Sequence, residues 1–160
     1  MPESLEVTIG RRLIQCGKTV GTAESCTGGL IGHRLTEVPG SSTYFLGGII
    51  AYSNVIKERV LGVKHETLEK HGAVSAETAL EMARGARRTL DTDIGLSVTG
   101  IAGPGGGLPG KPVGLVYIGL STRDFEQAEQ YIWDKDRAGN KWESSEAALK
   151  MLLEYLTRAA

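Results

Sequence analysis

Several side chains able to do chemistry stand together in the segment Thr22-Ala23-Glu24-Ser25-Cys26-Thr27-Gly28-Gly29. A short β-prone run, residues 18–23, leads into it, and a helix-like run, residues 30–38, follows. This order predicts hydroxyls, a thiol and free backbone N–H groups at a helix N-terminus, where an anion or a developing oxyanion is stabilised. The alternative is an ordinary strand-to-helix turn in which Ser25 or Thr27 only caps the helix.

Ser25 needs a base before it can act as a nucleophile. The histidines fit this role poorly, because their sequence positions are typical of surface or capping groups: His33, His65 and His71. Their spacing forms no metal-ligand pattern, and the two cysteines lack a paired one, so we expect no metal.

Lys57 is the remaining candidate base. It comes just after an apolar run that ends in Tyr52 and Ser53, and both residues could hydrogen-bond it. A lysine removed from water can lose its proton near neutral pH. The alternative is a solvated lysine on a short helix. Cys26 is the rival nucleophile, although adjacent side chains cannot easily reach the same substrate atom.

A second glycine-rich segment lies between Gly100 and Gly110, with six glycines and two prolines. Its spacings approach those of a dinucleotide fingerprint and of a P-loop. However, a strand follows where the fingerprint needs a helix, and Pro112 stands where the P-loop needs a hydroxyl. The segment follows the strand end Ser97-Val98-Thr99, where α/β sheets bind ligands, which favours a ligand-facing loop over a flexible surface loop.

Arg137 follows the last predicted strand and is suited to binding a phosphate or carboxylate through two hydrogen bonds. The alternative is a surface ion pair with Asp134 or Asp136.

Helices and strands alternate along the chain, and this pattern predicts a three-layer α/β/α sandwich with a mixed, partly parallel sheet. Apolar spacing and cap residues indicate helices at 3–16, 30–38, 54–61, 66–71, 75–90 and 145–157. Strands are predicted at 18–23, 47–53, 93–99, 112–121 and 126–133. Of these, 47–53 reads as a buried strand and 126–133 as an edge strand.

The composition predicts one soluble domain over residues 1–160. A net charge of -1 argues against nonspecific nucleic-acid binding, which needs a basic face. No apolar run is long enough for a membrane span, and the first residues lack a signal peptide's pattern. Two cysteines indicate a reduced, cytoplasmic setting rather than a disulfide scaffold.

Five motifs in order resemble the CinA C-terminal domain family over nearly the whole chain. They are Thr22–Gly29, Pro39-Gly40-Ser41-Ser42, Ala51-Tyr52-Ser53-Asn54 with Lys57, His71-Gly72-Ala73-Val74-Ser75, and Thr99–Gly106 with Lys111-Pro112-Val113-Gly114. That family includes stand-alone nicotinamide mononucleotide deamidases. The resemblance implies an α/β/α sandwich, a homodimer, and a metal-free amidohydrolase without cofactors that recycles pyridine nucleotide.

The resemblance maps the family's nucleophile to Ser25 and its general base to Lys57. It maps further positions lining the site to Ser42, Tyr52, Thr99 and Arg137. Ser25 would attack the carboxamide carbon, and Lys57 would move the proton to the departing ammonia.

Backbone groups would complete such a site. N–H groups near Thr27 and Gly28 are candidate oxyanion donors, while glycine N–H groups such as those of Gly100 and Gly103, with Arg137, are candidates for the substrate phosphate. The segment around Arg137, after the last predicted strand, departs from the family in two ways. Lys135 replaces a glycine usual in the family, and a second arginine that often follows is either replaced by Lys141 or absent.

Many family members carry a larger N-terminal domain, so we expect this chain to be either a stand-alone deamidase or a domain of a longer protein. The second reading of function is a non-catalytic nucleotide-binding accessory domain linked to competence or DNA damage. The presence of both Ser25 and Lys57 favours the enzyme, because a domain that only binds needs neither.

Overall fold

The computed structural model describes residues 1–159 of the chain. In chain order the elements are α1 (Leu5–Cys16), β1 (Val20–Glu24), α2 (Leu30–Thr36), the 3-10 turn η1 (Ser41–Thr43), β2 (Phe45–Ile50), α3 (Asn54–Leu61), α4 (His65–His71), α5 (Ala76–Leu90), β3 (Ile94–Gly100), β4 (Leu115–Ser121), β5 (Glu126–Ile132) and α6 (Arg137–Arg158). The sequence predicted every helix and strand in this order, but not the turn η1.

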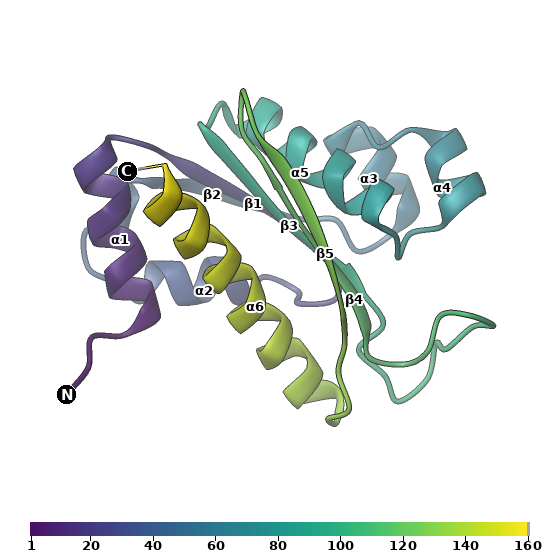
Figure 1. Ribbon diagram of the computed structural model, residues 1–160. Coiled ribbons are helices and arrows are strands. Elements are labelled where there is room, and N and C mark those ends of the chain that lie inside the picture. Colours follow the sequence, from purple (N-terminus) through teal and green to yellow (C-terminus); the bar gives the residue numbers. More distant parts are fainter. Residues whose placement is uncertain (160) are drawn as a thin grey trace.

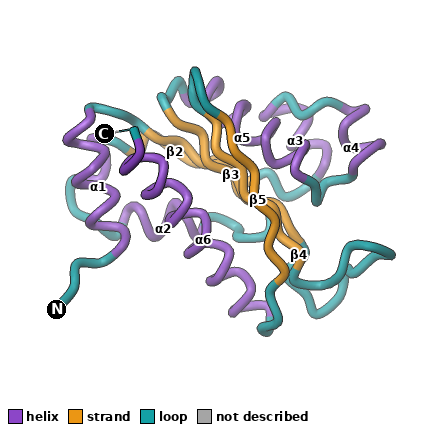
Figure 2. Tube along the Cα trace, in the orientation of Figure 1, coloured by secondary structure: helices purple, strands orange, loops and turns teal. Residues whose placement is uncertain are grey.

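Five strands form one sheet in the order β2-β1-β3-β4-β5 (Figures 1 and 2). Strands β2, β1 and β3 run parallel, while β4 pairs antiparallel with both β3 and β5. The expected mixed, partly parallel sheet is therefore confirmed. Because β1 and β2 are parallel neighbours, their carboxyl ends meet at the same edge of the sheet.

Helices cover both faces of the sheet, which confirms the three-layer sandwich (Figure 1). The helices α1, α2 and α6 lie on one face over the larger apolar core, which contains Leu13, Leu96 and Leu152. The helices α3, α4 and α5 lie on the other face, where a smaller core includes Ala23 and Met82. No helix within residues 1–159 has the length and apolar character to cross a membrane.

Local chemistry explains where the helices begin and end. Side chains accept hydrogen bonds from first-turn N–H groups at the N-caps Ser4, Ser53, Ser75 and Asp136. Gly17 and Gly62 end α1 and α3 in the left-handed conformation, which glycine adopts without a steric penalty. The cap Ser53 fixes the start of α3, so it also fixes the position of Lys57 one turn later.

Two predicted elements differ from the structure. The strand expected at 47–53 is β2, Phe45–Ile50, and it lies at the edge of the sheet with alternating exposure rather than buried. The helix expected at 145–157 begins at Arg137, two turns earlier. Asn140, Ser144 and Ser145 are buried polar residues on those turns, so hydrophobic periodicity gives no sign of the helix there.

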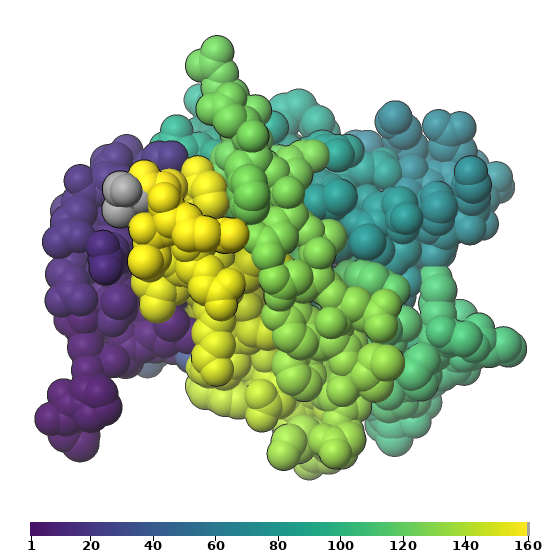
Figure 3. All heavy atoms as spheres, in the orientation of Figure 1, coloured from purple at the N-terminus to yellow at the C-terminus, as the bar shows by residue number. Residues whose placement is uncertain are grey.

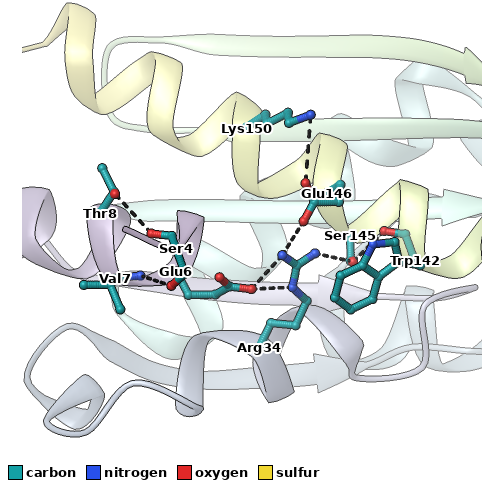
Figure 4. Close-up of polar contacts among 9 residues, drawn as sticks. All are labelled: Ser4, Glu6, Val7, Thr8, Arg34, Trp142, Ser145, Glu146 and Lys150. Carbon is teal, nitrogen blue, oxygen red and sulfur yellow. Dashed lines mark hydrogen bonds and ion pairs between the residues drawn. The ribbon is translucent and has the colours of Figure 1, made fainter. Parts of the chain in front are cut away.

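A buried arginine joins three helices on the larger-core face (Figure 4). Arg34 of α2 donates to Glu6 of α1 at 2.7 Å and to Ser145 of α6 at 2.8 Å, and it also pairs with Glu146. Its guanidinium carbon lies 4.1 Å from the centre of the Trp142 ring. This Arg34 cluster fixes α6 against α2, the helix that follows Ser25.

Candidate active site

Ser25 and Lys57 meet at the edge of the sheet where β1 and β2 end. Ser25 follows β1 directly, and Lys57 lies on α3, which follows β2. The Lys57 Nζ and Ser25 Oγ atoms are 3.0 Å apart, within hydrogen-bond distance. The pairing of these two side chains, 32 residues apart in the sequence, supplies the serine with a neighbouring base.

Lys57 is almost completely buried, with 1% of its surface exposed. Its amine also contacts the backbone oxygens of Ala51 at 3.0 Å and Tyr52 at 3.3 Å. No carboxylate in residues 1–159 forms an ion pair with it. Burial lowers the pKa of Lys57 from its ordinary value of 10.5, which favours the neutral amine.

The three contacts can be made in either protonation state of Lys57. An ammonium would donate to all three oxygens, whereas the neutral amine, which burial favours, divides its groups differently. It has two N–H donors, for the two backbone oxygens, and one lone pair, for the Ser25 hydroxyl proton. In this protonation state Ser25 donates to Lys57, which is the arrangement a general base needs. The alternative of a solvated lysine on a helix surface is wrong.

Cys26, the rival candidate nucleophile, lies next to Ser25 in the sequence. It is buried against the larger core, and this burial raises the pKa of its thiol to about 12. The thiolate is the reactive form of cysteine, so the Cys26 thiol is a poor nucleophile at neutral pH.

A pocket of about 180 Å³ opens over the pair. Six of its lining residues were candidates from the sequence: Ser25, Tyr52, Lys57, Thr99, Gly100 and Arg137. Cys26, the rival nucleophile, also lines it, and the remaining lining residues were not candidates from the sequence: Asn54, Ala73, Val74 and Ala102. Asn54 follows the helix cap Ser53, and a polar residue just after a strand end is the signal that could have indicated it.

Arg137 spans the rim of this pocket from the first turn of α6. It donates to the Gly103 oxygen at 2.8 Å and to the Tyr52 hydroxyl at 3.1 Å. No ion pair of Arg137 with Asp134 or Asp136 forms in the described part of the chain. Gly103 therefore meets Arg137 through its carbonyl, and the arginine joins the glycine loop to the end of β2.

The turn after Ser25 is organised by Glu24, the last residue of β1. Its buried carboxylate accepts from the N–H groups of Ile31 at 2.9 Å and Gly32 at 3.0 Å, and from the Thr27 hydroxyl at 2.7 Å. Glu24 therefore caps α2, and the alternative of a Ser25 or Thr27 cap is wrong. The N–H groups of Ile31 and Gly32 in the first turn of α2 are therefore not free, because the Glu24 carboxylate accepts from both.

The two candidate oxyanion donors differ in their hydrogen bonding. The Gly28 N–H donates to the Ser25 carbonyl at 3.1 Å, which closes the turn. The Thr27 N–H has no hydrogen-bond partner among residues 1–159. Of the two, Thr27 therefore keeps a backbone donor for a ligand.

Four candidates do not line the pocket: Thr27, Gly28, Gly103 and Ser42. Of these, Ser42 lies at the other end of β2. It lies exposed in η1, just before β2, whereas the pocket lies after the end of β2. The intervening strand has six residues, so at about 3.3 Å per residue Ser42 is roughly 20 Å from the Ser25–Lys57 pair.

The glycine-rich loop contributes only its first residues to the site. Gly100 and Ala102 line the pocket, and Ile101 to Gly103 are buried, whereas residues 104–110 are exposed. The exposed part projects from the body of the molecule, at the lower right of Figures 1 and 3. Lys111 returns toward the site and donates to the His71 carbonyl.

The histidines take no part in this site. His65 contacts Glu58 and Glu69, His33 lies near Glu37, and His71 lies near Glu77. No group of side chains suited to holding a metal ion occurs within residues 1–159.

Comparisons with known proteins agree over nearly the whole chain. The model of the CinA C-terminal domain matches residues 2–156. A putative competence-damage inducible protein of Halothermothrix orenii is 54% identical over 154 residues, covering 96% of this chain and 37% of the relative. A CinA-like protein of Chloroherpeton thalassium is 52% identical over 158 residues. The chain thus spans just over a third of the length of these relatives.

Solved structures show the same fold. A CinA superfamily protein of Klebsiella pneumoniae superposes with a TM-score of 0.93 at 31% identity, covering 96% of both chains. The competence/damage inducible protein CihA of Agrobacterium tumefaciens gives a TM-score of 0.89 at 42% identity, covering 98% of both chains.

Proposed function

Because the chain belongs to the CinA C-terminal domain family and pairs a buried lysine with a serine, we propose that it is an amidohydrolase. Its substrate is nicotinamide mononucleotide, and its products are nicotinate mononucleotide and ammonia. The observation that carries the proposal is the 3.0 Å contact between Lys57 Nζ and Ser25 Oγ in a pocket without an opposing carboxylate.

The reaction proceeds through an ester on Ser25. As Lys57 takes the hydroxyl proton, the Ser25 oxygen bonds to the carboxamide carbon, with the unpaired Thr27 N–H as the candidate donor to the developing oxyanion. Lys57 then gives its proton to the amide nitrogen, the C–N bond breaks and ammonia leaves. Water attacks the ester with Lys57 again as base, which releases the carboxylate and restores Ser25.

The electrostatics of the pocket suit this substrate. A pyridinium ring carries a fixed positive charge that makes its carboxamide more electrophilic, and the same charge disfavours a protonated lysine nearby. The substrate thus reinforces the lowered pKa of Lys57. Arg137 at the rim supplies a guanidinium toward the phosphate end of the nucleotide.

The test is ammonia release from nicotinamide mononucleotide by the purified protein under metal-free, reducing conditions. Ser25→Ala and Lys57→Ala should each lower turnover by at least about 10³-fold. Cys26→Ala is the matched control, one residue from the nucleophile, and should keep most of the activity. No turnover by the wild type would overturn the proposal. If Cys26→Ala lost activity and Ser25→Ala kept it, the nucleophile would be Cys26 rather than Ser25.

A second candidate is a non-catalytic nucleotide-binding accessory domain; the relatives' printed names support its link to competence or damage, but do not mention nucleotide binding. In the enzyme reading, the protein acts in the cytoplasm, recycles pyridine nucleotide, and works as a homodimer. Sedimentation of the purified chain tests the last point, since a mass of one chain contradicts it.

A further inference from the structure

A second and larger cavity, the α6 groove, lies beside the catalytic pocket and has a volume of about 730 Å³. The two cavities share Ala102 and Arg137, so one ligand can extend from one into the other. Cavities of about 300–1,000 Å³ hold drug-sized ligands, whereas the catalytic pocket is well below that range. Any part of a ligand beyond the reacting ring therefore finds space in the α6 groove.

The charge of the α6 groove favours anions. Three cationic side chains line it, Lys135, Arg137 and Lys141, against one carboxylate, Asp136, which caps α6 by accepting the Gly139 N–H at 2.8 Å. No salt bridge among residues 1–159 neutralises the three cations. The Lys141 ammonium lies 3.7 Å from where a Cβ on Gly28 would stand, close to the turn after Ser25.

Trp142 gives the same groove an aromatic wall. Its side chain is 48% exposed although it is large and apolar. The Arg34 guanidinium lies over the ring, and Arg34 is itself buried and held by Glu6 and Glu146 (Figure 4). The indole is therefore supported by a fixed group and remains partly open to a planar ligand. Leu30, Pro104 and Val113 add apolar surface to this cavity.

From these observations we infer that the α6 groove binds a planar heterocycle carried on a phosphate linker, with the heterocycle stacked on Trp142. The ligand class is a dinucleotide amide, in which a diphosphate joins the pyridine nucleotide to a second nucleoside. The inference rests on the proposed function only in placing the carboxamide at Ser25. The diphosphate then lies among Lys141, Arg137 and Lys135, and the second base reaches the indole.

A mononucleotide matches the groove less completely. Its phosphate can meet the cations, but it carries no second ring to cover Trp142 or the apolar floor. Stacking of one base on an aromatic side chain contributes enough free energy for about a tenfold gain in affinity. The longer ligand therefore binds more tightly than the mononucleotide.

The experiment is isothermal titration of the Ser25→Ala protein, which prevents turnover, with nicotinamide mononucleotide and with nicotinamide adenine dinucleotide. The dinucleotide should bind about tenfold more tightly. Adding Trp142→Ala should remove this gain and leave mononucleotide affinity within about twofold, whereas Trp142→Phe should keep most of the gain because a planar ring remains.

A second measurement uses the wild type and needs no groove variant. The dinucleotide should compete with the mononucleotide and so lower the rate at which nicotinate mononucleotide forms, a product that the dinucleotide itself does not give. Equal affinity of the protein for the two ligands overturns the inference. So does a result in which Trp142→Ala and Trp142→Phe each weaken the binding of both ligands by the same factor. Ammonia release without tighter dinucleotide binding would support the proposed function and overturn the inference about the α6 groove. Dinucleotide binding that depends on Trp142, without ammonia release, would support the inference about the groove and overturn the proposed function.

Discussion

Burial of Lys57 favours the neutral form of its amine beside Ser25, so the proposed reaction should depend on pH. The amine is a base only when unprotonated, and burial lowers the pKa at which it loses its proton. We expect kcat/KM for the amide substrate to rise with pH up to that lowered pKa and then to level off. Measuring the pH–rate profile of the wild type checks this.

The control for this profile is Cys26→Ala. Because the Cys26 thiol has a pKa of about 12, its removal should leave the rise at the same pH. Lys57→Arg should be inactive at every pH, because an arginine side chain does not lose its proton in proteins. A rise that survives in Lys57→Arg would assign the base to another residue.

The same burial predicts how stability changes with pH. The folded-state pKa of Lys57 lies below the ordinary 10.5, so between these two values the unfolded chain binds more protons than the folded one. The free energy of unfolding should therefore rise with pH in that window, by at most about 1.4 kcal/mol per pH unit from this group.

Lys57→Met isolates this contribution, because methionine fills similar space without a proton to lose. Urea unfolding at two pH values should show the wild type gaining stability relative to Lys57→Met as the pH rises. A constant difference between the two proteins would mean that the lysine titrates alike in both states.

At the scale of residues, the sequence predicted the contact between Ser25 and Lys57 better than it predicted the residues around them. Ser25 and Lys57 could be paired from their positions after two strand ends and from the family resemblance. Glu24 was part of a recognised motif, but its role as the α2 cap depends on where the helix begins. Ser42 shows the limit, because a motif does not say at which end of a strand it will lie.

At the scale of elements, we expect the Arg34 cluster to contribute more to the free energy of unfolding than any other group of ion pairs in the described residues. Arg34 is buried, and its loss would leave two carboxylates, Glu6 and Glu146, without their partner. Partial burial alone would raise the pKa of Glu6, but hydrogen bonds from its backbone N–H and from Arg34 outweigh this and lower it. The folded state therefore holds Glu6 ionised.

We expect Arg34→Ala to lower the free energy of unfolding by about 3 kcal/mol. Arg11→Ala is the matched control, because the pair of Arg11 with Glu3 joins exposed groups and should contribute less than about 1 kcal/mol. Urea denaturation of both variants at neutral pH provides the comparison. Equal losses in the two would show that burial of Arg34 adds nothing.

Element boundaries were predictable wherever a cap or an apolar pattern marked them. Ser75 and Gly17 are such positions, whereas Gly47 and Gly48 carry no side chain to show which face of β2 is buried. The first turns of α6 stayed hidden because they bury Asn140, whose amide donates to the Ala102 carbonyl at 2.9 Å. A buried polar contact of this kind becomes visible only in the folded chain.

At the scale of the whole molecule, the alternation of helices and strands predicted the three layers, but the strand order required the structure. Composition also makes a prediction at this scale. With a net charge of -1 the chain should not bind a short DNA duplex at physiological salt. Fluorescence anisotropy with a labelled duplex checks this, and tight binding would favour the accessory-domain candidate instead.

The contact between Ser25 and Lys57 also joins two βα units that differ in how many neighbouring strands hold them. Ser25 follows β1, which has neighbours on both sides, whereas Lys57 follows β2, which has a neighbour on one side only. Edge elements open at lower free energy than central ones. Local opening of β2 and α3 would separate base from nucleophile while the rest of the fold stays intact. Enzyme activity should therefore be lost at milder denaturing conditions than the bulk helical signal.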